Sequence, residues 1–427
     1  MSSSSRRVFL QQAGLGTTAL GMSGTLHARR ANEKIVVGLI GCGGRARRFL
    51  AYAGFLCDPD ATRLGEAVKQ TGVTAARAVT DMRRLLDDPS VDAVVIATPD
   101  HWHAPAALLA LEAGKHVYVE KPCSHNFRES QLLLDAARRS NRVVQHGTQQ
   151  RSSPIASETI AMLREGVIGN VLVAKAWNVQ VRPNIGHALP AAIPAELNYD
   201  LWVGPAPFVP FQPNRLHYNW HWWHSFGTGD IGNDGTHEID FARWGLGVDT
   251  LPTKVAAIGG KYFHDDDQQF PDTAVCTFEY PGDDKAGARR QLIFEMRLWS
   301  TNYPLNCDTG VEFIGTQGKL TFSKRGRIEI LGPRNKVIKQ ERFESSKNME
   351  HMENFLSAIR SGAPPNAPME EAHRSVALVH LANIAIRTGR SITLDPQREQ
   401  ILGDEEASKM LKRAYRENGH WAIPRGV

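Results

Sequence analysis

The sequence is poor in cysteine, with five in 427 residues and no Cys-x-x-Cys pair. Such an odd, widely spaced set excludes a disulfide framework or a zinc ribbon, and it predicts structural thiols. Long apolar runs are also lacking, so we expect no membrane-spanning helix. Lysine and arginine form no long basic run with interleaved aromatics, and the net charge is only +5, which disfavours nucleic-acid binding.

The composition is that of a folded globular protein, with 42% hydrophobic and 22% charged residues. A chain of this length usually divides into domains. We predict a first domain at residues 34–150 and a second at 151–427. Residues 1–30 stand apart, because the segment SRRVFL at 5–10 is typical of a twin-arginine signal, which predicts a periplasmic protein. The alternative is a disordered N-terminus with an accidental arginine pair.

A Gly-rich turn follows the first predicted strand, the near-continuous apolar run KIVVGLI at 34–40. The turn GCGGRA fits the GxGxxA dinucleotide-binding pattern. Its first glycine permits the tight turn, its second lets the backbone approach a pyrophosphate, and the alanine lets strand and helix pack closely. Amides of the following helix would face the phosphates. The expected cofactor contacts in this turn are Gly41, Cys42, Gly43, Gly44, Arg45 and Ala46.

Asp58 ends the second predicted strand. A carboxylate there can bond the adenosine ribose hydroxyls, which favours NAD over NADP without excluding NADP. The alternative is a turn aspartate before Pro59. The stretch 46–56 is short for a complete helix and strand, so it indicates a clipped first helix.

Strands and short helices then alternate up to His146. We predict strands at 77–80, 91–98, 115–120 and 142–146, and helices at 81–86, 104–113 and 127–140. The alternation predicts βαβ units in a doubly wound parallel sheet, the Rossmann arrangement. Because ligands bind beyond the carboxyl ends of such strands, TPDHWH at 98–103 and EKP at 120–122 should lie beside the cofactor.

The second domain is predicted to be an α/β domain with a large, mostly antiparallel sheet. Period-two patterns, expected for a sheet with one covered face, recur in several of its strands. The expected strands lie at 171–181, 255–263, 274–280, 290–298 and 318–322, with a hairpin turn at 316–319 and helices at 154–166, 349–360 and 372–388.

Five of the nine tryptophans lie between positions 201 and 245, at 202, 220, 222, 223 and 244. Flat aromatic faces pack on the C–H faces of a sugar ring, so one or two of them should contact a sugar while the others are structural. The same region holds His217, His221, His224 and His237 with Asp234 and Glu238, a set whose spacing invites a metal interpretation. The flanking Gly and Trp residues indicate a loop, and we predict no metal.

Three segments together resemble the glucose-fructose oxidoreductase, inositol dehydrogenase and rhizopine-catabolism (Gfo/Idh/MocA) family. They are GCGGRA, ATPDHWHAPAALLALEAGKHVYVEKP and GDIGNDGTHEIDFARW, and the resemblance runs from residue 34 to beyond 320. It implies a Rossmann domain, a nicotinamide cofactor, a sugar, glycoside or cyclitol substrate, and a second domain whose open sheet often makes a homodimer or homotetramer. The N-terminal segment and NYDLWVGPAP resemble the exported branches of the family.

The resemblance also implies residue roles. Lys121 would reach the nicotinamide ribose and a substrate hydroxyl, and His237 would be the catalytic base. The sequence departs from the family pattern DxxxHExD, because the residue four positions before the histidine is Asn233 instead of aspartate. Asp234 follows directly, so either Asn233 or Asp234 could orient the imidazole. A surface lysine and a structural histidine are the alternatives. The other expected contacts are Thr98, Pro99, His103, Glu120 and Gln149 with the cofactor, and Arg182, Trp220, Trp222, His224 and His237 with the substrate.

The leading hypothesis is therefore an NAD-dependent oxidoreductase acting on a sugar ring hydroxyl. Because free NAD is not expected outside the cytoplasm, export predicts a tightly held cofactor that is reset in place. One alternative is a glycoside hydrolase that oxidises the sugar transiently, eliminates the aglycone and re-reduces the product. Another is a non-catalytic sugar-binding protein.

Overall fold

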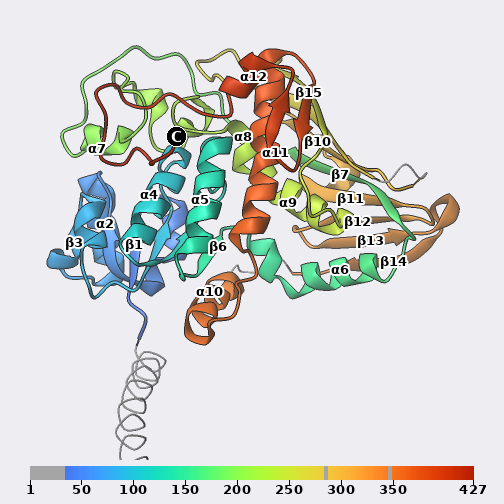
Figure 1. The fold of residues 1–427 in the computed structure, drawn as a ribbon, viewed down its shortest axis with the longest axis horizontal. Helices are drawn as coiled ribbons and strands as arrows, with labels where there is room; N and C mark the ends of the chain where they lie inside the picture. The colour runs from blue at the N-terminus through green and yellow to red at the C-terminus, as the bar shows by residue number, and fades with distance from the viewer. Residues whose placement is uncertain (1–33, 283–286, 345–348) are drawn as a thin grey trace, which may run out of the picture.

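A computed structural model describes residues 34–282, 287–344 and 349–427; the predicted signal at 1–30 lies outside them. Two α/β units lie side by side (Figure 1), one on a six-stranded parallel sheet and one on a ten-stranded, mostly antiparallel sheet. The predicted fold class is confirmed. Among the described residues, no helix combines the length and the apolar character needed to cross a membrane.

The first sheet has the strand order β3-β2-β1-β4-β5-β6. Its strands are β1 (Val37–Ile40), β2 (Ala53–Cys57), β3 (Ala78–Val79), β4 (Ala93–Ile96), β5 (His116–Val119) and β6 (Val144–His146). Its helices are α2 (Ala61–Thr71), α3 (Met82–Leu86), α4 (Asp100–Glu112) and α5 (Phe127–Arg139). The order reverses between β1 and β4, which creates a crevice at their carboxyl ends.

The shortened first helix of this unit confirms a prediction, whereas the start of α4 differs from one. The Gly-rich turn leads into two 3-10 turns, η1 (Arg45–Arg48) and η2 (Leu50–Tyr52), because the chain re-enters the sheet at Ala53 and leaves no length for an α-helix. The expected helix N-terminus at the phosphates is thus a single 3-10 turn. In addition, α4 begins four residues earlier than predicted, at Asp100, so TPDHWH is largely helical.

The second sheet has the order β14-β13-β12-β11-β7-β10-β9-β8-β15-β16, in which only β7 and β10 pair in parallel among the described strands. Its strands are β7 (Val171–Val179), β8 (Lys254–Gly260), β9 (Thr273–Tyr280), β10 (Arg290–Arg297), β11 (Thr309–Gly315), β12 (Lys319–Ser323), β13 (Arg327–Leu331), β14 (Val337–Arg342), β15 (Ile392–Asp395) and β16 (Gln400–Leu402). The predicted hairpin between β11 and β12 is confirmed. The sequence patterns missed β11 and the last four strands.

One face of the second sheet is covered by helices (Figure 1). The covering helices are α6 (Pro154–Arg164), α9 (Gly235–Leu246) and α11 (Met369–Thr388), and the shorter helices α8 (Gly229–Asn233) and α12 (Glu405–Lys409) lie near them. The short helix α7 (Tyr199–Val203) lies over the first unit instead, beside α4 (Figure 1). Phe278, Phe294 and Phe313 are fully buried beneath them. The other face carries the exposed Ile258 and Val275 beside ion pairs such as Lys319 to Glu312.

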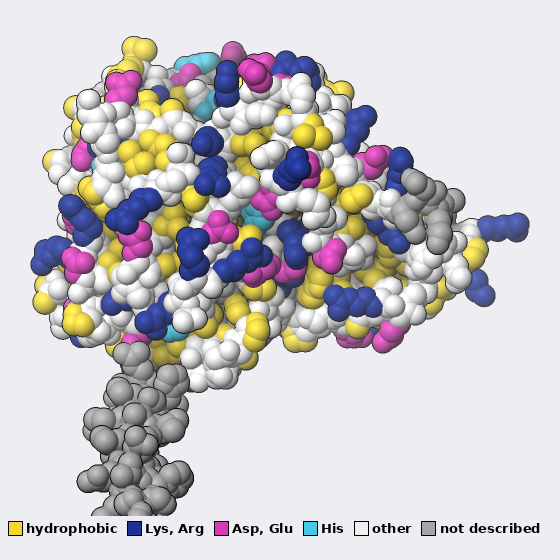
Figure 2. All heavy atoms as spheres, in the orientation of Figure 1, with side chains coloured by type: hydrophobic (Ala, Val, Ile, Leu, Met, Phe, Trp, Pro, Cys, Tyr) yellow, Lys and Arg dark blue, Asp and Glu magenta, His cyan; other side chains and the backbone are white. Residues whose placement is uncertain are grey.

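Segments near the C-terminus return to the first unit. Helix α10 (Met349–Ser361) inserts Phe355 into the core beneath β1 and β4. The irregular segment after α12 crosses to α4, and the end of the chain lies beside α4 and α7 (Figure 1). There Trp421 packs on Trp102, with 5.6 Å between ring centroids. On the face shown in Figure 2, cationic and anionic side chains are interspersed.

Candidate active site

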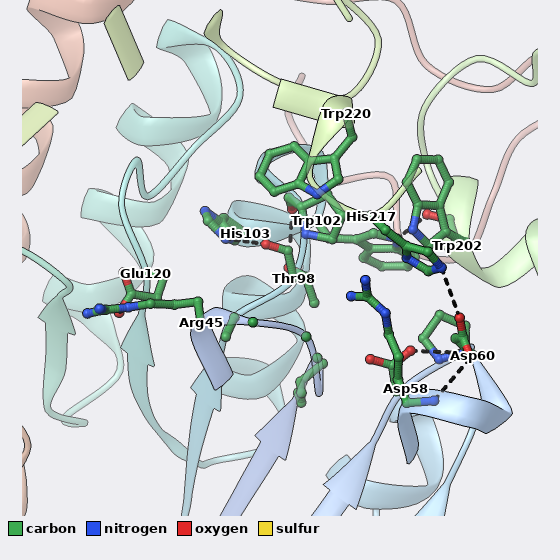
Figure 3. Close-up of a pocket in the computed structure, with 18 of the residues that line it drawn as sticks. Arg45, Asp58, Asp60, Thr98, Trp102, His103, Glu120, Trp202, His217 and Trp220 are labelled. Carbon is green, nitrogen blue, oxygen red and sulfur yellow. Dashed lines mark hydrogen bonds and ion pairs between the residues drawn. The ribbon is translucent and has the colours of Figure 1, made fainter. Parts of the chain in front are cut away.

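A cavity of about 660 Å³ opens at the carboxyl ends of the parallel strands, between the first sheet and the loops that precede α8 (Figure 3). The predicted residues that line it are Gly41, Gly43, Gly44, Arg45, Asp58, Thr98, Pro99, His103, Glu120, Lys121, Arg182, Trp220, Asn233, Asp234 and His237. The folded chain therefore brings together the Gly-rich turn, EKP and the histidine motif.

Gly41 and Gly43 shape one wall of the cavity. Gly41 has a φ of 90°, and an added Cβ would lie 2.6 Å from the carbonyl oxygen of Ala97. At Gly43 an added Cβ would lie 2.6 Å from Nη1 of Arg63. Gly41 needs glycine because its backbone conformation and the Ala97 carbonyl leave no room for a side chain. At Gly43 a side chain would displace only the mobile end of Arg63, and the glycine leaves space for a ligand to approach the backbone.

Asp58 holds the Gly-rich turn in place. Its Oδ2 accepts a hydrogen bond from the amide of Cys42 at 2.7 Å, and its Oδ1 accepts one from the amide of Asp60 at 2.9 Å. Burial raises the pKa of Asp58 to about 6. Each carboxylate oxygen has a second lone pair, so Asp58 can also accept from a ligand hydroxyl. The Cys42 amide is occupied, and Cys42 does not line the cavity, contrary to its predicted role.

Two further predicted cofactor residues stand behind the wall. Ala46 is fully buried in the core. Gln149 donates from Nε2 to Oε1 of Glu120 at 3.1 Å, and Nε of Arg45 donates to the same oxygen at 2.7 Å. Arg45 and Gln149 thus fix the Glu120 carboxylate at the cavity surface, while Gln149 itself lies outside the lining residues.

Lys121 reaches across the cavity to the second unit. Its Nζ donates to the carbonyl oxygen of Asn233 at 2.7 Å and to Oδ1 of Asn233 at 3.0 Å. Nδ2 of Asn233 donates in turn to Oδ1 of Asp230 at 2.9 Å. Asn233 therefore orients Lys121, and both polar atoms of its side chain are engaged by Lys121 and Asp230 rather than by the imidazole of His237 that it was expected to orient.

Asp234 is engaged by cations rather than by the imidazole. Its Oδ2 accepts from Nη2 of Arg182 and, at 2.9 Å, from Nε2 of Gln180. Lys324 and Arg182 hold the pKa of Asp234 well below its usual range. Arg182 also contacts Asp230 at 3.2 Å. The arginine predicted for substrate thus lines the cavity in a fixed position between two carboxylates.

His237 lies near the N-terminus of α9 and is half-buried. Its imidazole has no hydrogen-bond partner among the described residues, so a ring nitrogen is free for a ligand. Burial, Lys324 and Lys121 together lower the pKa of His237 well below its ordinary value. The ring is therefore neutral at pH 7, the state that a general base requires.

Lys324, which the sequence patterns did not single out, adds to burial in lowering the pKa of His237. Its Nζ lies 2.9 Å from Oε1 of Glu238, next to His237 in the chain. Because the lysine charge disfavours an imidazolium, Lys324→Gln should raise the pKa of His237. The acid limb of the kcat/KM profile should move to higher pH. The matched control is Lys319→Gln, at the start of β12, the strand that Lys324 directly follows. An acid limb of the kcat/KM profile that stays at the same pH in Lys324→Gln would contradict this role.

The tryptophans of this region differ in their access to the cavity. Trp202 and Trp220 line the cavity, and so do Trp102 and Trp421 from elsewhere in the chain. Trp222, by contrast, is 1% exposed.

Two predicted substrate residues lie outside the cavity. Trp222 lies in the core, and His224 lines a second cavity. The structure therefore contradicts the predicted contacts of Trp222 and His224 with a ligand in the first cavity. Neighbouring side chains of this one loop face different sides, which residue type alone does not reveal.

His221 is a cavity residue that sequence reasoning had weighed only as a metal ligand. Its ring stacks on Trp220 with centroids 3.6 Å apart, and its Nδ1 contacts the carbonyl oxygen of Tyr218. That contact makes Nδ1 the donor and leaves Nε2 as an acceptor. Burial, and then Lys121, lower the pKa of His221 to about 3. The cavity thus holds a second neutral imidazole.

The histidines do not converge on a metal. His217 pairs with Asp60, with Nε2 and Oδ2 3.2 Å apart. Within residues 34–282, 287–344 and 349–427, no group of three or more His, Cys, Asp or Glu residues could hold a metal ion.

Comparisons with known proteins agree with this architecture. Residues 35–148 match the oxidoreductase family with an NAD-binding Rossmann fold, and residues 175–289 and 300–423 match its C-terminal alpha/beta domain. Levoglucosan dehydrogenase of Pseudarthrobacter phenanthrenivorans is 30% identical over 231 residues, which cover 50% of this chain and 52% of that protein. Myo-inositol 2-dehydrogenase of Thermotoga maritima is 23% identical over 400 residues, 91% of this chain and 99% of that protein.

Solved structures share the fold. Levoglucosan dehydrogenase in complex with NADH superposes with a TM-score of 0.64 at 20% identity, covering 84% of this chain and 99% of that chain. Aldose-aldose oxidoreductase from Caulobacter crescentus, complexed with glycerol, has a TM-score of 0.65 at 17% identity, covering 85% of this chain and 100% of that chain. At these identities the likeness establishes the two-unit architecture.

Proposed function

Because the chain belongs to the Gfo/Idh/MocA family of NAD-binding oxidoreductases, we propose that it oxidises a ring hydroxyl of a sugar, glycoside or cyclitol. The observation that carries the proposal is the arrangement of Lys121, Asn233 and the neutral His237 around the cavity that the Gly-rich turn opens. The sugar-related names of the relatives support this substrate class.

The residues present fit NAD. Gly41 and Gly43 leave the turn bare where a pyrophosphate approaches, and Asp58 presents carboxylate oxygens for ribose hydroxyls. Arg45 would neutralise phosphate charge beside Glu120. When bound, the nicotinamide supplies the hydride acceptor, and the protein supplies orientation and proton handling.

His237 would accept the hydroxyl proton as the carbinol carbon is oxidised, since its imidazole is neutral and has a free nitrogen. Lys121, held by Asn233, would place its one remaining N–H group toward the substrate oxygen and stabilise developing negative charge there. Arg182 and Asp234, which are joined in an ion pair, form a charged part of the wall of the same cavity.

We also propose that the cofactor is held tightly. Trp421 packs on Trp102 in the cavity wall, and Cζ of Arg83 lies 4.5 Å from the centroid of Trp421. Both tryptophans line the cavity, so a segment distant in sequence forms part of its wall. Such retention suits the proposed twin-arginine export to the periplasm, where the cofactor would be reset within the protein.

Trp421→Ala should therefore speed NAD dissociation about tenfold, the equivalent of ~1.4 kcal/mol. The rate is measured by following cofactor release after rapid dilution of the loaded protein. Trp299→Ala is the matched control, because Trp299 stacks on Phe263 far from this cavity. Equal release rates in the two variants would refute a retaining role for Trp421.

A homodimer or homotetramer is proposed through the uncovered face of the second sheet. That face exposes Ile258 and Val275, with Ile258 76% exposed, among paired charges. Light scattering of the purified protein measures the oligomeric state directly, and a strictly monomeric protein would overturn the proposed oligomer.

The second candidate is a glycoside hydrolase that works by transient oxidation, elimination and re-reduction. His221 favours it, because elimination needs a proton transfer at a second carbon and His221 adds a second neutral imidazole to the cavity. Aldose-aldose oxidoreductase, by its name, couples two sugars in one redox cycle, which supports an internally reset cofactor.

One experiment separates these outcomes. The purified protein is denatured, the released nucleotide is identified by mass, and the native protein is then assayed with glycosides and free sugars with and without added NAD. Retained NAD with sugar oxidation supports the main proposal, and aglycone release without added NAD supports the hydrolase. The absence of any bound or bindable nicotinamide nucleotide would refute both.

A further inference from the structure

A second cavity of about 390 Å³ lies behind the loop that carries His224. It is formed by the start of α5, the last turns of α11, helix α12 and the segment 412–414, together with residues 224–228. Trp220 and His221, a few residues earlier in that loop, face the first cavity instead. The two cavities are therefore distinct, with no lining residue in common.

Arg413 lies in the wall of this cavity and carries buried donors without a partner. Its side chain is only 7% exposed, and its Nη2 lies 2.7 Å from Oε1 of Glu129 and donates to the carbonyl oxygen of His101 at 2.8 Å. That carbonyl needs a donor because Pro105, four residues on in α4, has no N–H to offer it. Nε and Nη1 of Arg413 have no hydrogen-bond partner in the described part of the chain.

Asn126 adds a second unpaired donor. It caps α5, a 13-residue helix, and its Oδ1 accepts from the amide of Glu129 at 3.1 Å. The cap fixes the orientation of the amide, so Nδ2 is the group left without a partner, and the residue is 5% exposed. Leaving such a donor unsatisfied in a folded protein is costly unless a ligand or water completes it.

The unpaired charges around the opening of the second cavity are positive. Arg387, Lys409 and Lys412 line the cavity and form no ion pair among the described residues. Glu406 is the one acidic lining residue found there, and it is 2.7 Å from Arg390 in an ion pair. The N-terminus of α5 adds partial positive charge at the cavity. A ligand that complements these cations and donors must therefore carry negatively charged acceptor oxygens.

We propose that the second cavity binds a small organic oxoanion, whose phosphate or carboxylate group is held by Arg413 and Asn126 and attracted by the three rim cations. The cavity is several times larger than an inorganic ion, so it has room for a carbon skeleton attached to that group. The proposal does not depend on the reaction in the first cavity.

Calorimetric titration of the NAD-saturated protein with inorganic phosphate, and separately with gluconate, tests this proposal at constant ionic strength. Asn126→Asp keeps the helix cap but replaces the free donor with a carboxylate. We expect it to bind at least tenfold more weakly than the wild type while unfolding at the same temperature without anion. The rim variant Arg387→Gln/Lys409→Gln/Lys412→Gln should also weaken binding.

The matched control for the rim is Arg164→Gln/Lys254→Gln/Lys336→Gln, which removes the same three charges from exposed positions elsewhere. Binding of phosphate alone identifies a phosphoryl ligand class, and binding of gluconate alone identifies a carboxylate class. Failure of both anions to bind, or equal affinity in the wild type and Asn126→Asp, would overturn the proposal.

Discussion

His237→Ala is expected to lower kcat by about 10²–10⁴-fold, the usual contribution of a positioned general base. The imidazole is the neutral, unpaired group beside Lys121 in the cavity, so its removal leaves the hydroxyl proton without an acceptor. NAD should stay bound, because the Gly-rich turn and Asp58 are untouched. Steady-state kinetics and nucleotide content of the variant are measured together.

His221→Ala is the matched control for this prediction, since it removes another neutral imidazole of the same cavity. If the main proposal holds, its oxidation rate falls far less than that of His237→Ala. Added imidazole should restore part of the activity of His237→Ala. A larger loss in His221→Ala would reassign the base and strengthen the elimination pathway.

Lys121→Ala is expected to lower kcat/KM on the order of 10²–10³-fold, as is usual when a buried donor to a developing oxyanion is removed. The lysine is held at 2.7 Å and 3.0 Å by two oxygens of Asn233, so its position is fixed before substrate arrives. Asn233 and Asp230 stay hydrogen-bonded to each other without it, and the variant should fold.

Asn233→Ala separates positioning from charge. It leaves the carbonyl contact of Lys121 but removes the Oδ1 contact, so the loss should be intermediate and should be mainly in kcat. Thermal unfolding and NAD content check that both variants are intact. Wild-type turnover in Lys121→Ala would show that the lysine acts only as a structural link between the two units.

Much of the first unit could be predicted because its signals are local. The apolar run before Gly41, the Gly-rich turn and the alternation up to His146 each depend on neighbouring residues, and they locate the strands within a few positions. The second sheet was harder. Strand β14 has no buried residue in VIKQER, so it lacks the alternation that marks a half-buried strand.

In the candidate site, too, residues within local motifs could be predicted and those brought in from distant parts of the chain could not. Lys121 and His237 carry recognisable motifs, whereas Lys324 acts on His237 from 87 positions away and belongs to no motif. The side of the loop to which Trp222 points depends on the packing of Trp220 and Tyr218, which only the folded chain defines. The position of Asp58 at the end of its strand could be predicted from the sequence, but the hydrogen bond that its carboxylate accepts from the amide of Cys42 could not.

The crossing of Arg413 and Trp421 onto α4 has a consequence for biosynthesis. These residues leave the ribosome after every strand of both sheets. Until they dock, the carbonyl of His101 lacks the Arg413 donor and the ring of Trp102 lacks its contact with Trp421. A tag or cleavage site placed after residue 412 is therefore expected to lower cofactor content before it lowers the turnover of the loaded protein.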